Sequence, residues 1–161
     1  MRMISIRPLA ADDARACDAI LASLPYHFGL EDGRRECAEA VRSQPGLVAV
    51  EEGEVVGFLT VQPRFEAAAE ITWIAVRADR RGRHVGRQLM DRLAADLEGE
   101  GRRLLLVLTV SPNDQPDEIE DGYQATRAFY AANGFDLARD FDGYWGDHDL
   151  PVLLVRVLRG T

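Results

Sequence analysis

The residues best suited to chemistry lie in the range 77–87, which holds five arginines and one aspartate in a chain of net charge −8. An apolar segment precedes this range and an amphipathic one follows it, so the arginines stand where a helix begins. The first turn of a helix offers unpaired N–H groups and the positive end of the helix dipole. Gly82 and Gly86 let the backbone approach an anion, and three side chains add donors suited to phosphate oxygens: Arg81, Arg83 and Arg87. The pattern predicts a phosphate site, although a solvated Arg/Gly turn would look the same.

Other phosphate-binding and catalytic motifs do not fit this sequence. A P-loop requires Gly-Lys-Ser/Thr, and all 19 basic residues are arginine. A dinucleotide fingerprint requires G-x-G-x-x-G, which the two glycines of the turn do not supply. Cys17 and Cys37 have no metal-ligand spacing, so both are expected to be apolar fillers and no metal is expected.

The same turn resembles the cofactor signature of the GCN5-related N-acetyltransferases, Arg/Gln-x-x-Gly-x-Gly/Ala. Here it reads Arg81-Gly82-Arg83-His84-Val85-Gly86, with His84 in place of the first glycine. The resemblance extends over nearly the whole chain through three further segments: ISIRPLAADD (residues 4–13), VGFLTV (56–61) and ATRAFYAANGF (125–135).

The resemblance implies an α/β (α+β mixed) fold: a mixed, mostly antiparallel twisted sheet of about seven strands flanked by about four helices. It also implies one parallel β-α-β unit that splays at a cleft for acetyl-CoA. The turn at 81–86, with Arg87, would hold the pyrophosphate, and the main chain of one strand would lie along the pantetheine arm: Ile74, Ala75 and Val76. An acetyl group would then pass directly to a primary amine of a small molecule or peptide.

Two residues acquire catalytic roles by this resemblance. Tyr130 matches the general acid that protonates the departing sulfur, and the alternative is an amphipathic tyrosine at the edge of the core. Glu70 opens the strand beside the cleft and is the candidate base, and the alternative is a solvated strand end. Rival bases are Glu66, Asp114, Asp117 and Tyr123.

Two segments are predicted to line the acceptor site. One contains Tyr26, His27 and Phe28, and the other contains Tyr144 and Trp145. Residues 111–149 hold ten acids and two arginines, which favours a cationic acceptor or else forms only a solubilising face. The main alternative function is a CoA-binding regulatory protein that retains the fold without catalysis.

Hydrophobic periodicity places these residues on definite elements. Strands are predicted at 3–8, 47–51, 54–62, 70–76, 104–110, 135–138 and 152–158. Helices are predicted from Asp12 to Pro25, over 32–42 and 83–98, and from 121 to 133. Glu52-Gly53 is predicted to be a hairpin turn, and 70–110 a parallel β-α-β unit.

Length and composition bound the remaining options. A chain of 161 residues with 47% hydrophobic and 29% charged residues is expected to form one acetyltransferase domain, 1–161. No signal peptide and no apolar run of membrane-spanning length are apparent, so a cytoplasmic protein is expected. The negative net charge argues against nucleic acid as the main partner. The oligomeric state stays open, with a homodimer among the options.

Overall fold

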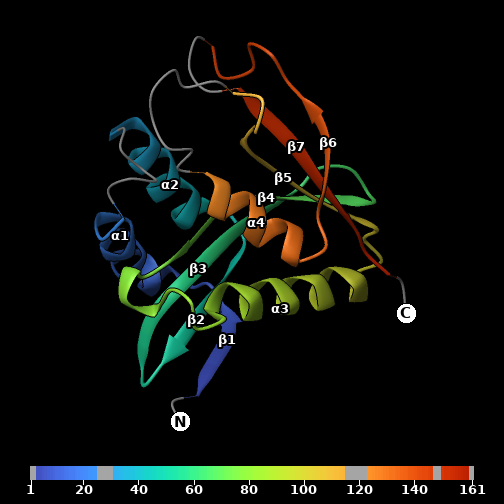
Figure 1. Cartoon of the computed structure of the whole chain (residues 1–161). Helices are drawn as coiled ribbons and strands as arrows, with labels where there is room; N and C mark the ends of the chain where they lie inside the picture. Colours follow the sequence, from blue (N-terminus) through green and yellow to red (C-terminus); the bar gives the residue numbers. More distant parts are fainter. Residues whose placement is uncertain (1–2, 25–30, 115–122, 147–149, 160–161) are drawn as a thin grey trace.

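Seven strands form one twisted sheet in the computed structural model of the chain (Figure 1). The structure describes residues 3–24, 31–114, 123–146 and 150–159. The strand order is β1-β2-β3-β4-β5-β7-β6, and every neighbouring pair is antiparallel except β4 and β5. The strands are β1 (Ile4–Pro8), β2 (Gly46–Glu51), β3 (Glu54–Pro63), β4 (Ala68–Val76), β5 (Leu104–Val110), β6 (Asp136–Asp140) and β7 (Pro151–Val157).

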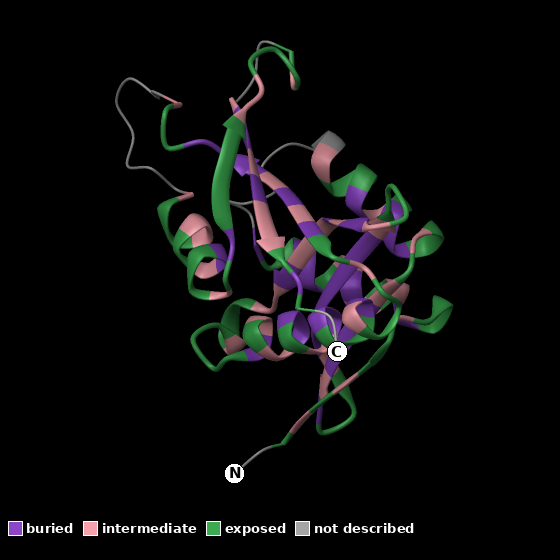
Figure 2. Ribbon diagram, turned by 90° about the vertical axis from the view of Figure 1, so that its right-hand side faces the viewer, coloured by how far each residue is buried: buried purple, intermediate pink, exposed green. Residues whose placement is uncertain are grey.

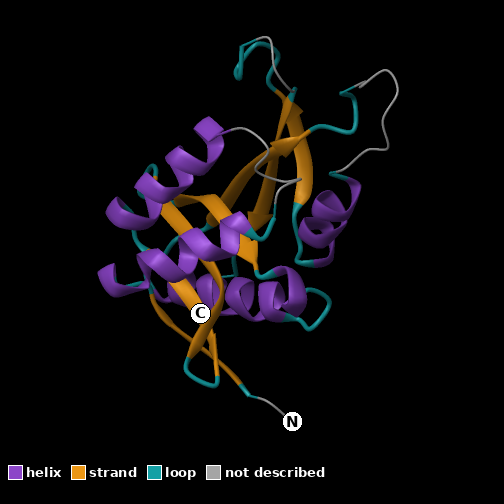
Figure 3. Cartoon of the chain, turned by 90° about the vertical axis from the view of Figure 1, so that its left-hand side faces the viewer, coloured by secondary structure: helices purple, strands orange, loops and turns teal. Residues whose placement is uncertain are grey.

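Helices cover both faces of this sheet. α1 (Ala14–Ala22) and α2 (Glu31–Ser43) lie on one face, and α3 (Val85–Gly99) and α4 (Gln124–Ala132) lie on the other (Figures 1 and 3). Short 3-10 turns, η1 (Ala11–Asp13) and η2 (Ala78–Arg80), precede α1 and follow β4. The predicted fold class is therefore confirmed: a mixed, mostly antiparallel sheet with one parallel pair. Within the described residues, none of the helices combines the length and apolar character needed to cross a membrane.

Each face of the sheet has its own hydrophobic core because strand side chains alternate between faces. Leu59, Ile71 and Leu105 belong to the core under α3 and α4. Phe58 and Ala75 belong to the core under α1 and α2, together with the predicted helical stripe of Cys17, Ile20, Leu21 and Leu24. Figure 2 shows this burial concentrated along the middle of the sheet, whereas β6 is exposed along most of its length.

One predicted boundary shifts at the start of α3 for a reason visible in the backbone. The helix was expected from residue 83 and begins at Val85, because two residues before it have left-handed backbones. Gly82 has φ of 78° and His84 has φ of 63°. A left-handed residue cannot continue a right-handed helix, so these residues form a turn that leads into α3.

Candidate active site

The parallel strands β4 and β5 are paired over only part of their length. Their register runs from Ala68 opposite Leu104 to Ile71 opposite Val107 and goes no further. Beyond this point β4 continues its pairing with β3 as far as Val76, and β5 continues its pairing with β7 as far as Val110. The strands therefore separate, as predicted, and leave a gap between their carboxyl-terminal halves.

Main-chain groups of β4 point into this gap. The Arg77 N–H donates to the Val56 carbonyl of β3 at 2.8 Å. In an antiparallel pair the direction of the main-chain groups alternates, so those of Ala75 also point toward β3. Those of Ile74 and Val76 consequently point away from β3 and toward the gap. Of the three residues predicted along the pantetheine arm, these two have main-chain groups directed into the gap.

A β-bulge marks the place where the gap opens. Thr60 lies opposite Trp73 and Val61 lies opposite Ile71, so Thr72 is left over in the register. A bulge bends its strand and increases the local twist. The Thr72 hydroxyl is hydrogen-bonded to Thr60 at 2.7 Å and to Gln44 at the end of α2. Sequence reasoning missed this bulge, since a threonine in an apolar strand resembles any other strand residue.

The turn before α3 presents a row of unpaired backbone donors. Within the described part of the chain, the N–H groups of residues 82–87 have no hydrogen-bond acceptor, and the first helical bond runs from Gln88 to His84 at 3.0 Å. No atom lies within 4 Å of the position that a Cβ at Gly82 would occupy. These donors and the helix dipole together make the turn a candidate anion site.

The arginines of this region divide into two groups. Arg77 and Arg80 are engaged in ion pairs, with Asp79 at 2.6 and 3.0 Å respectively, and Arg80 also reaches the buried Glu51 at 3.2 Å. These pairs tie η2 to the end of β2.

The second group lies nearer the unpaired amides. Arg83 has no ion pair within the described part of the chain, and Arg87 has only a long contact of 3.9 Å with Asp91. These two exposed guanidinium groups are therefore available to an anion at the start of α3.

Gly86 connects this turn to α4. A Cβ at Gly86 would lie 2.9 Å from Cε1 of Phe129, so only glycine allows the ring this close. Phe129 thus packs on the first turn of α3, which fixes α4 relative to the anion site. The neighbouring residue on α4 is Tyr130.

Tyr130 is buried, with 4% of its surface exposed, and belongs to the core under α3 and α4. Its ring makes edge-on contacts with Phe129 and Phe135, each at a centroid distance of 5.4 Å. Burial raises the pKa of the Tyr130 phenol, so the group keeps its proton at any physiological pH.

Arg127 ties α4 to the edge of the gap. Its guanidinium donates to the carbonyl of Val110, the last residue of β5, at 2.8 Å. Arg127 and Tyr130 are three residues apart on α4 and so lie on adjacent turns of the same side. Sequence reasoning did not single out Arg127. The i, i+3 spacing to Tyr130 is the signal that could have identified it.

Glu70 lies directly before the point of separation, opposite Leu106 of β5. Its side chain is 20% exposed and accepts a hydrogen bond from Arg64 Nε at 2.9 Å. By strand alternation it faces the α1/α2 side, opposite to Ile71. Of the rival bases, Glu66 is exposed and Asp114 accepts a hydrogen bond from the Leu150 N–H at 3.1 Å. Asp117 lies outside the described residues.

The predicted acceptor residues are only partly described. Tyr26, His27 and Phe28 lie outside the described residues. Tyr144 is 64% exposed in the segment between β6 and β7, and Trp145 beside it is half-buried. This segment contributes exposed aromatic surface at the same end of the sheet as the carboxyl-terminal end of β5 (Figure 1).

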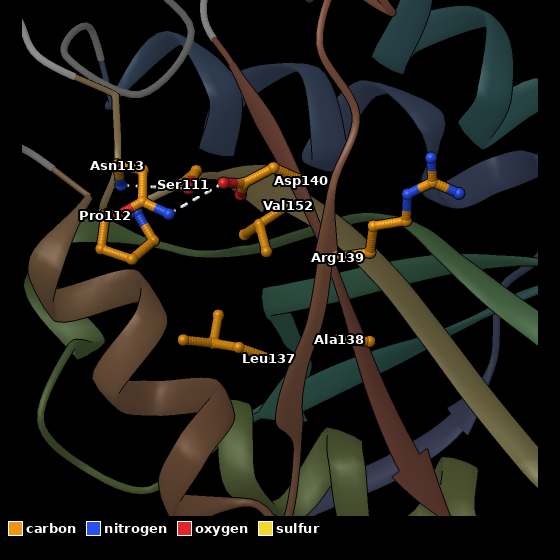
Figure 4. A pocket seen from close by; sticks show the side chains of 8 residues that line it. All are labelled: Ser111, Pro112, Asn113, Leu137, Ala138, Arg139, Asp140 and Val152. Carbon is orange, nitrogen blue, oxygen red and sulfur yellow. Dashed lines mark hydrogen bonds between the residues drawn. The ribbon is translucent and has the colours of Figure 1, made fainter.

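A small cleft of about 190 Å³ lies where the segment after β5 meets β6. Figure 4 shows Asn113 and Asp140 directed toward each other across it, joined by a hydrogen bond of 2.8 Å, with Arg139 pointing away. Hydrogen bonds from Asn113 and Ser111 hold the pKa of Asp140 below its usual range. Binding pockets for drug-sized ligands occupy roughly 300–1,000 Å³, so this cleft is small for a ligand site. We interpret it as a structural contact between the segment after β5 and β6.

Comparisons with known proteins agree with this geometry. The family model described as acetyltransferase (GNAT) domain matches residues 43–137. A crystal structure assigned to the GNAT acetyltransferases, from Desulfovibrio desulfuricans, has 20% identity and a TM-score of 0.83 over 98% of this chain and 100% of the other.

Two other solved structures carry names that state an activity. The ribosomal-protein-S18-alanine N-acetyltransferase of Escherichia coli has 20% identity and a TM-score of 0.76, covering 99% and 96% of the two chains. An aminoglycoside 6'-N-acetyltransferase complexed with coenzyme A has 16% identity and a TM-score of 0.75, covering 98% of each chain. These likenesses concern the fold. No curated protein sequence matches the chain.

Proposed function

The chain belongs to the GNAT family of acetyltransferases, whose domain model covers more than half of it, and we propose that it transfers an acetyl group directly from acetyl-CoA to a primary amine. The observation that carries this proposal is the gap between β4 and β5. It has an anion site at the start of α3 and a buried tyrosine on the helix that is tied to β5.

The residues at the gap fit acetyl-CoA. The unpaired amides of residues 82–87 match a pyrophosphate group, and Arg83 and Arg87 add positive charge beside them. Ile74 and Val76 offer main-chain donors and acceptors to an arm that carries amide groups of its own. When bound, acetyl-CoA supplies an acetyl thioester that an amine can attack without an acyl-enzyme.

Three groups of the chain would then serve the reaction. A main-chain N–H of β4 at Ile74 polarises the thioester carbonyl, a role of the oxyanion-hole type. Tyr130 acts as general acid: its phenol donates a hydrogen bond and then its proton to the departing sulfur, and it is reprotonated from solvent. Burial keeps the Tyr130 phenol protonated and so available as a donor.

The amine must lose its protons, and Glu70 is the proposed base. Its position beside the opening of the gap on the α1/α2 side supports this role, and its hydrogen bond to Arg64 keeps the carboxylate in place. Tyr26, His27, Phe28, Tyr144 and Trp145 stay proposed acceptor contacts. The acidic character of 111–149 favours a cationic acceptor, so turnover of a true substrate should weaken with added salt.

A matched pair of variants tests cofactor binding at the amides. Arg87→Pro removes one N–H of the first turn of α3, where proline is tolerated, and Arg87→Ala removes the same guanidinium but keeps the N–H. A hydrogen bond to a charged group contributes about 1.5–3 kcal/mol, so Arg87→Pro should bind acetyl-CoA roughly 10- to 100-fold more weakly than Arg87→Ala in calorimetry. Equal affinities in two folded variants would remove these amides from the site.

The same preparation distinguishes an enzyme from a CoA-binding protein without catalysis. Release of CoA in the presence of a library of small amines and peptide N-termini would establish turnover and identify the acceptor class. Tight acetyl-CoA binding without release for any amine would favour the binding protein.

A further inference from the structure

A buried acid contacts the residue directly before the Arg/Gly turn, which comprises residues 81–87. Glu51 is the last residue of β2, and only 4% of its surface is exposed. It lies opposite Ile4 of β1, which packs on the core under α3 and α4, so its side chain is on the α3 side of the sheet. A carboxylate in such a place is unfavourable unless a cation compensates it.

Arg80 supplies that cation. Its Nε donates to Oε2 of Glu51 at 3.2 Å, and its Nη1 forms an ion pair with Asp79 at 3.0 Å. The Arg80 side chain is only 15% exposed, so water screens this contact less than it screens the surface pairs of the chain. A planar guanidinium bonded to two carboxylates has its position set by both of them.

Within the described residues, the N–H groups of 82–87 do not help to fix the Arg/Gly turn, because they have no hydrogen-bond acceptor. The turn is instead held from its two ends. At the helical end Val85 is buried, and a Cβ at Gly57 of β3 would lie 3.0 Å from its side chain. At the other end Arg80 is bonded to Glu51. The bond between Arg80 and Glu51 therefore attaches the start of the turn to the end of β2.

Charge alone would make Glu51 unfavourable for an anion site. A carboxylate repels a nearby anion, and burial reduces the screening by water. Glu51 lies directly opposite Glu54 of β3, so two acids lie side by side at this end of the sheet. Glu54 contacts Arg77 at 3.3 Å and is 71% exposed, whereas Glu51 is buried against Arg80. The two acids therefore carry the same charge but differ in the contact that they make.

We propose that Glu51 is a positioning residue for the coenzyme: through Arg80 it holds the Arg/Gly turn where the N–H groups of 82–87 meet the pyrophosphate. This inference rests on the proposed function. The turn contributes to binding because groups that are already in place lose less entropy when the ligand binds. That contribution exceeds the repulsion between the Glu51 carboxylate and the pyrophosphate, so the two effects have opposite signs in a binding measurement.

Two substitutions of Glu51 remove the same charge and differ in one hydrogen bond. Glu51→Gln keeps an oxygen that accepts from Arg80 Nε, whereas Glu51→Met keeps the length of the side chain without that acceptor. A hydrogen bond to a charged group accounts for a factor of roughly 10–100 in an equilibrium constant, and part of it should reach the turn. In calorimetry Glu51→Met should bind acetyl-CoA roughly tenfold more weakly than Glu51→Gln, and more weakly than the wild type. Equal affinities, or tighter binding by Glu51→Met than by the wild type, would overturn the proposal.

Two controls separate positioning from general damage. Glu54→Met removes a carboxylate at the same end of the sheet and should not weaken acetyl-CoA binding, because Glu54 is exposed and contacts Arg77 instead of Arg80. S-acetylpantetheine lacks the pyrophosphate, so both Glu51 variants should bind it with the same affinity. A loss for S-acetylpantetheine as large as that for acetyl-CoA, or a matching loss in Glu54→Met, would also contradict the proposal.

Circular dichroism checks that Glu51→Met is folded. If it is not, Arg80→Lys takes its place, since a single ammonium cannot reproduce both bonds of the guanidinium while the net charge stays the same. This variant should also bind acetyl-CoA more weakly, and wild-type affinity in it would contradict the proposal. A wild type that does not bind acetyl-CoA would instead contradict the proposed function. Wild-type binding with equal affinities of the Glu51 variants would leave that function standing.

Discussion

The two halves of the β4–β5 pair differ more in their neighbours than in their own composition. The closed half, Ala68–Ile71 with residues 104–107, and the open half, residues 72–76 with 108–110, are both rich in aliphatic residues. In the open half each strand keeps its outer partner, β3 or β7, but loses the inner one. Apolar strand composition alone therefore does not keep a sheet closed.

What separates the open half is a set of specific contacts. The Thr72 bulge bends β4 where pairing stops, and Arg127 supplies a hydrogen bond to the Val110 carbonyl at the end of β5. Backbone groups that lose a strand partner need another one. The backbone groups that border the gap are therefore bound by α4, through Arg127, or, in our proposal, by the cofactor.

The largest effect is expected from a change on the open side that leaves packing intact. Tyr130→Phe keeps the ring between Phe129 and Phe135 and deletes only the hydroxyl. General acid catalysis typically contributes about 10²–10⁴-fold, so kcat should fall by that range while acetyl-CoA affinity stays close to wild type. Single-turnover measurements check whether chemistry or product release limits the rate. Unimpaired chemistry would make Tyr130 a structural residue.

Two hydrogen bonds from an arginine to a strand carbonyl, one at the gap and one at the β1 edge of the sheet, allow a direct comparison. Arg127 donates to Val110 at the gap, and Arg92 of α3 donates to the Ile6 carbonyl of β1 at 2.9 Å. Substitution of either by alanine should lower the free energy of unfolding by about 1–2 kcal/mol. Only Arg127→Ala should also lower kcat, by roughly tenfold, because a small misplacement of the α4 acid is costly in catalysis. Equal kcat in both variants would separate the position of α4 from the reaction.

A pH-dependent hydrogen bond at the β1–α1 junction, away from the gap, should change stability alone. Hydrogen bonds from Arg7, at 2.8 and 2.9 Å, hold the pKa of Asp13 below its usual range, and the Ala10 N–H adds another. Because the pKa of Asp13 is lower in the folded state than in the unfolded state, its charged form stabilises the fold. This stabilisation is fully present above the unfolded pKa of about 3.9 and is lost as the pH falls through the folded pKa.

Asp13→Asn should therefore cost about 1–2 kcal/mol near neutral pH, allowing for the half-exposed Arg7, and less in acid. Denaturant titrations of Asp13→Asn and the wild type, at neutral pH and in acid, measure the loss of stability at each pH. The kcat of the variant should stay at the wild-type value. A kcat that falls together with stability would show that the β1–α1 junction also positions the gap.

The smallest effect is expected at the turn that leads into α3. His84 has φ of 63°, and a left-handed backbone costs a residue with a Cβ about 1–2 kcal/mol. His84→Gly should raise the free energy of unfolding by roughly 0.5–1 kcal/mol, since glycine also loses more entropy on folding. His84→Ala keeps the Cβ and should show no such gain in chemical denaturation. A gain for both variants would trace the effect to the imidazole instead.

The sequence predicted the elements well because their periodicity is local. The stripe of Cys17, Ile20, Leu21 and Leu24 is buried, as its helical spacing predicts, and β5 has the predicted bounds. The start of α3 moved to Val85 because His84 has a positive φ, which excludes it from the helix. A histidine, unlike a glycine, gives no indication in the sequence that its φ is positive. β6 runs over Asp136–Asp140 rather than 135–138, since Phe135 packs against Tyr130 and an exposed edge strand has no alternation to detect.

The site was predicted where a motif is contiguous and was incomplete where it depends on distant contacts. The Arg/Gly turn can be recognised from neighbouring residues alone. Arg127 and Thr72 act through partners on other elements, Val110 and Thr60, which no local pattern identifies. Tyr130 was singled out by its motif, but its burial and its contact with Phe135 follow only from the packing of α4.

The two cysteines have a practical consequence. Cys17 and Cys37 are the only thiols of the chain, both are fully buried, and burial raises the pKa of each to about 12. The thiolate, not the thiol, attacks a thiol reagent, so the native protein should give almost no background in a colorimetric thiol assay. Every equivalent of colour would then count one molecule of CoA released, and slow labelling without substrate would report how often the α1–α2 layer opens.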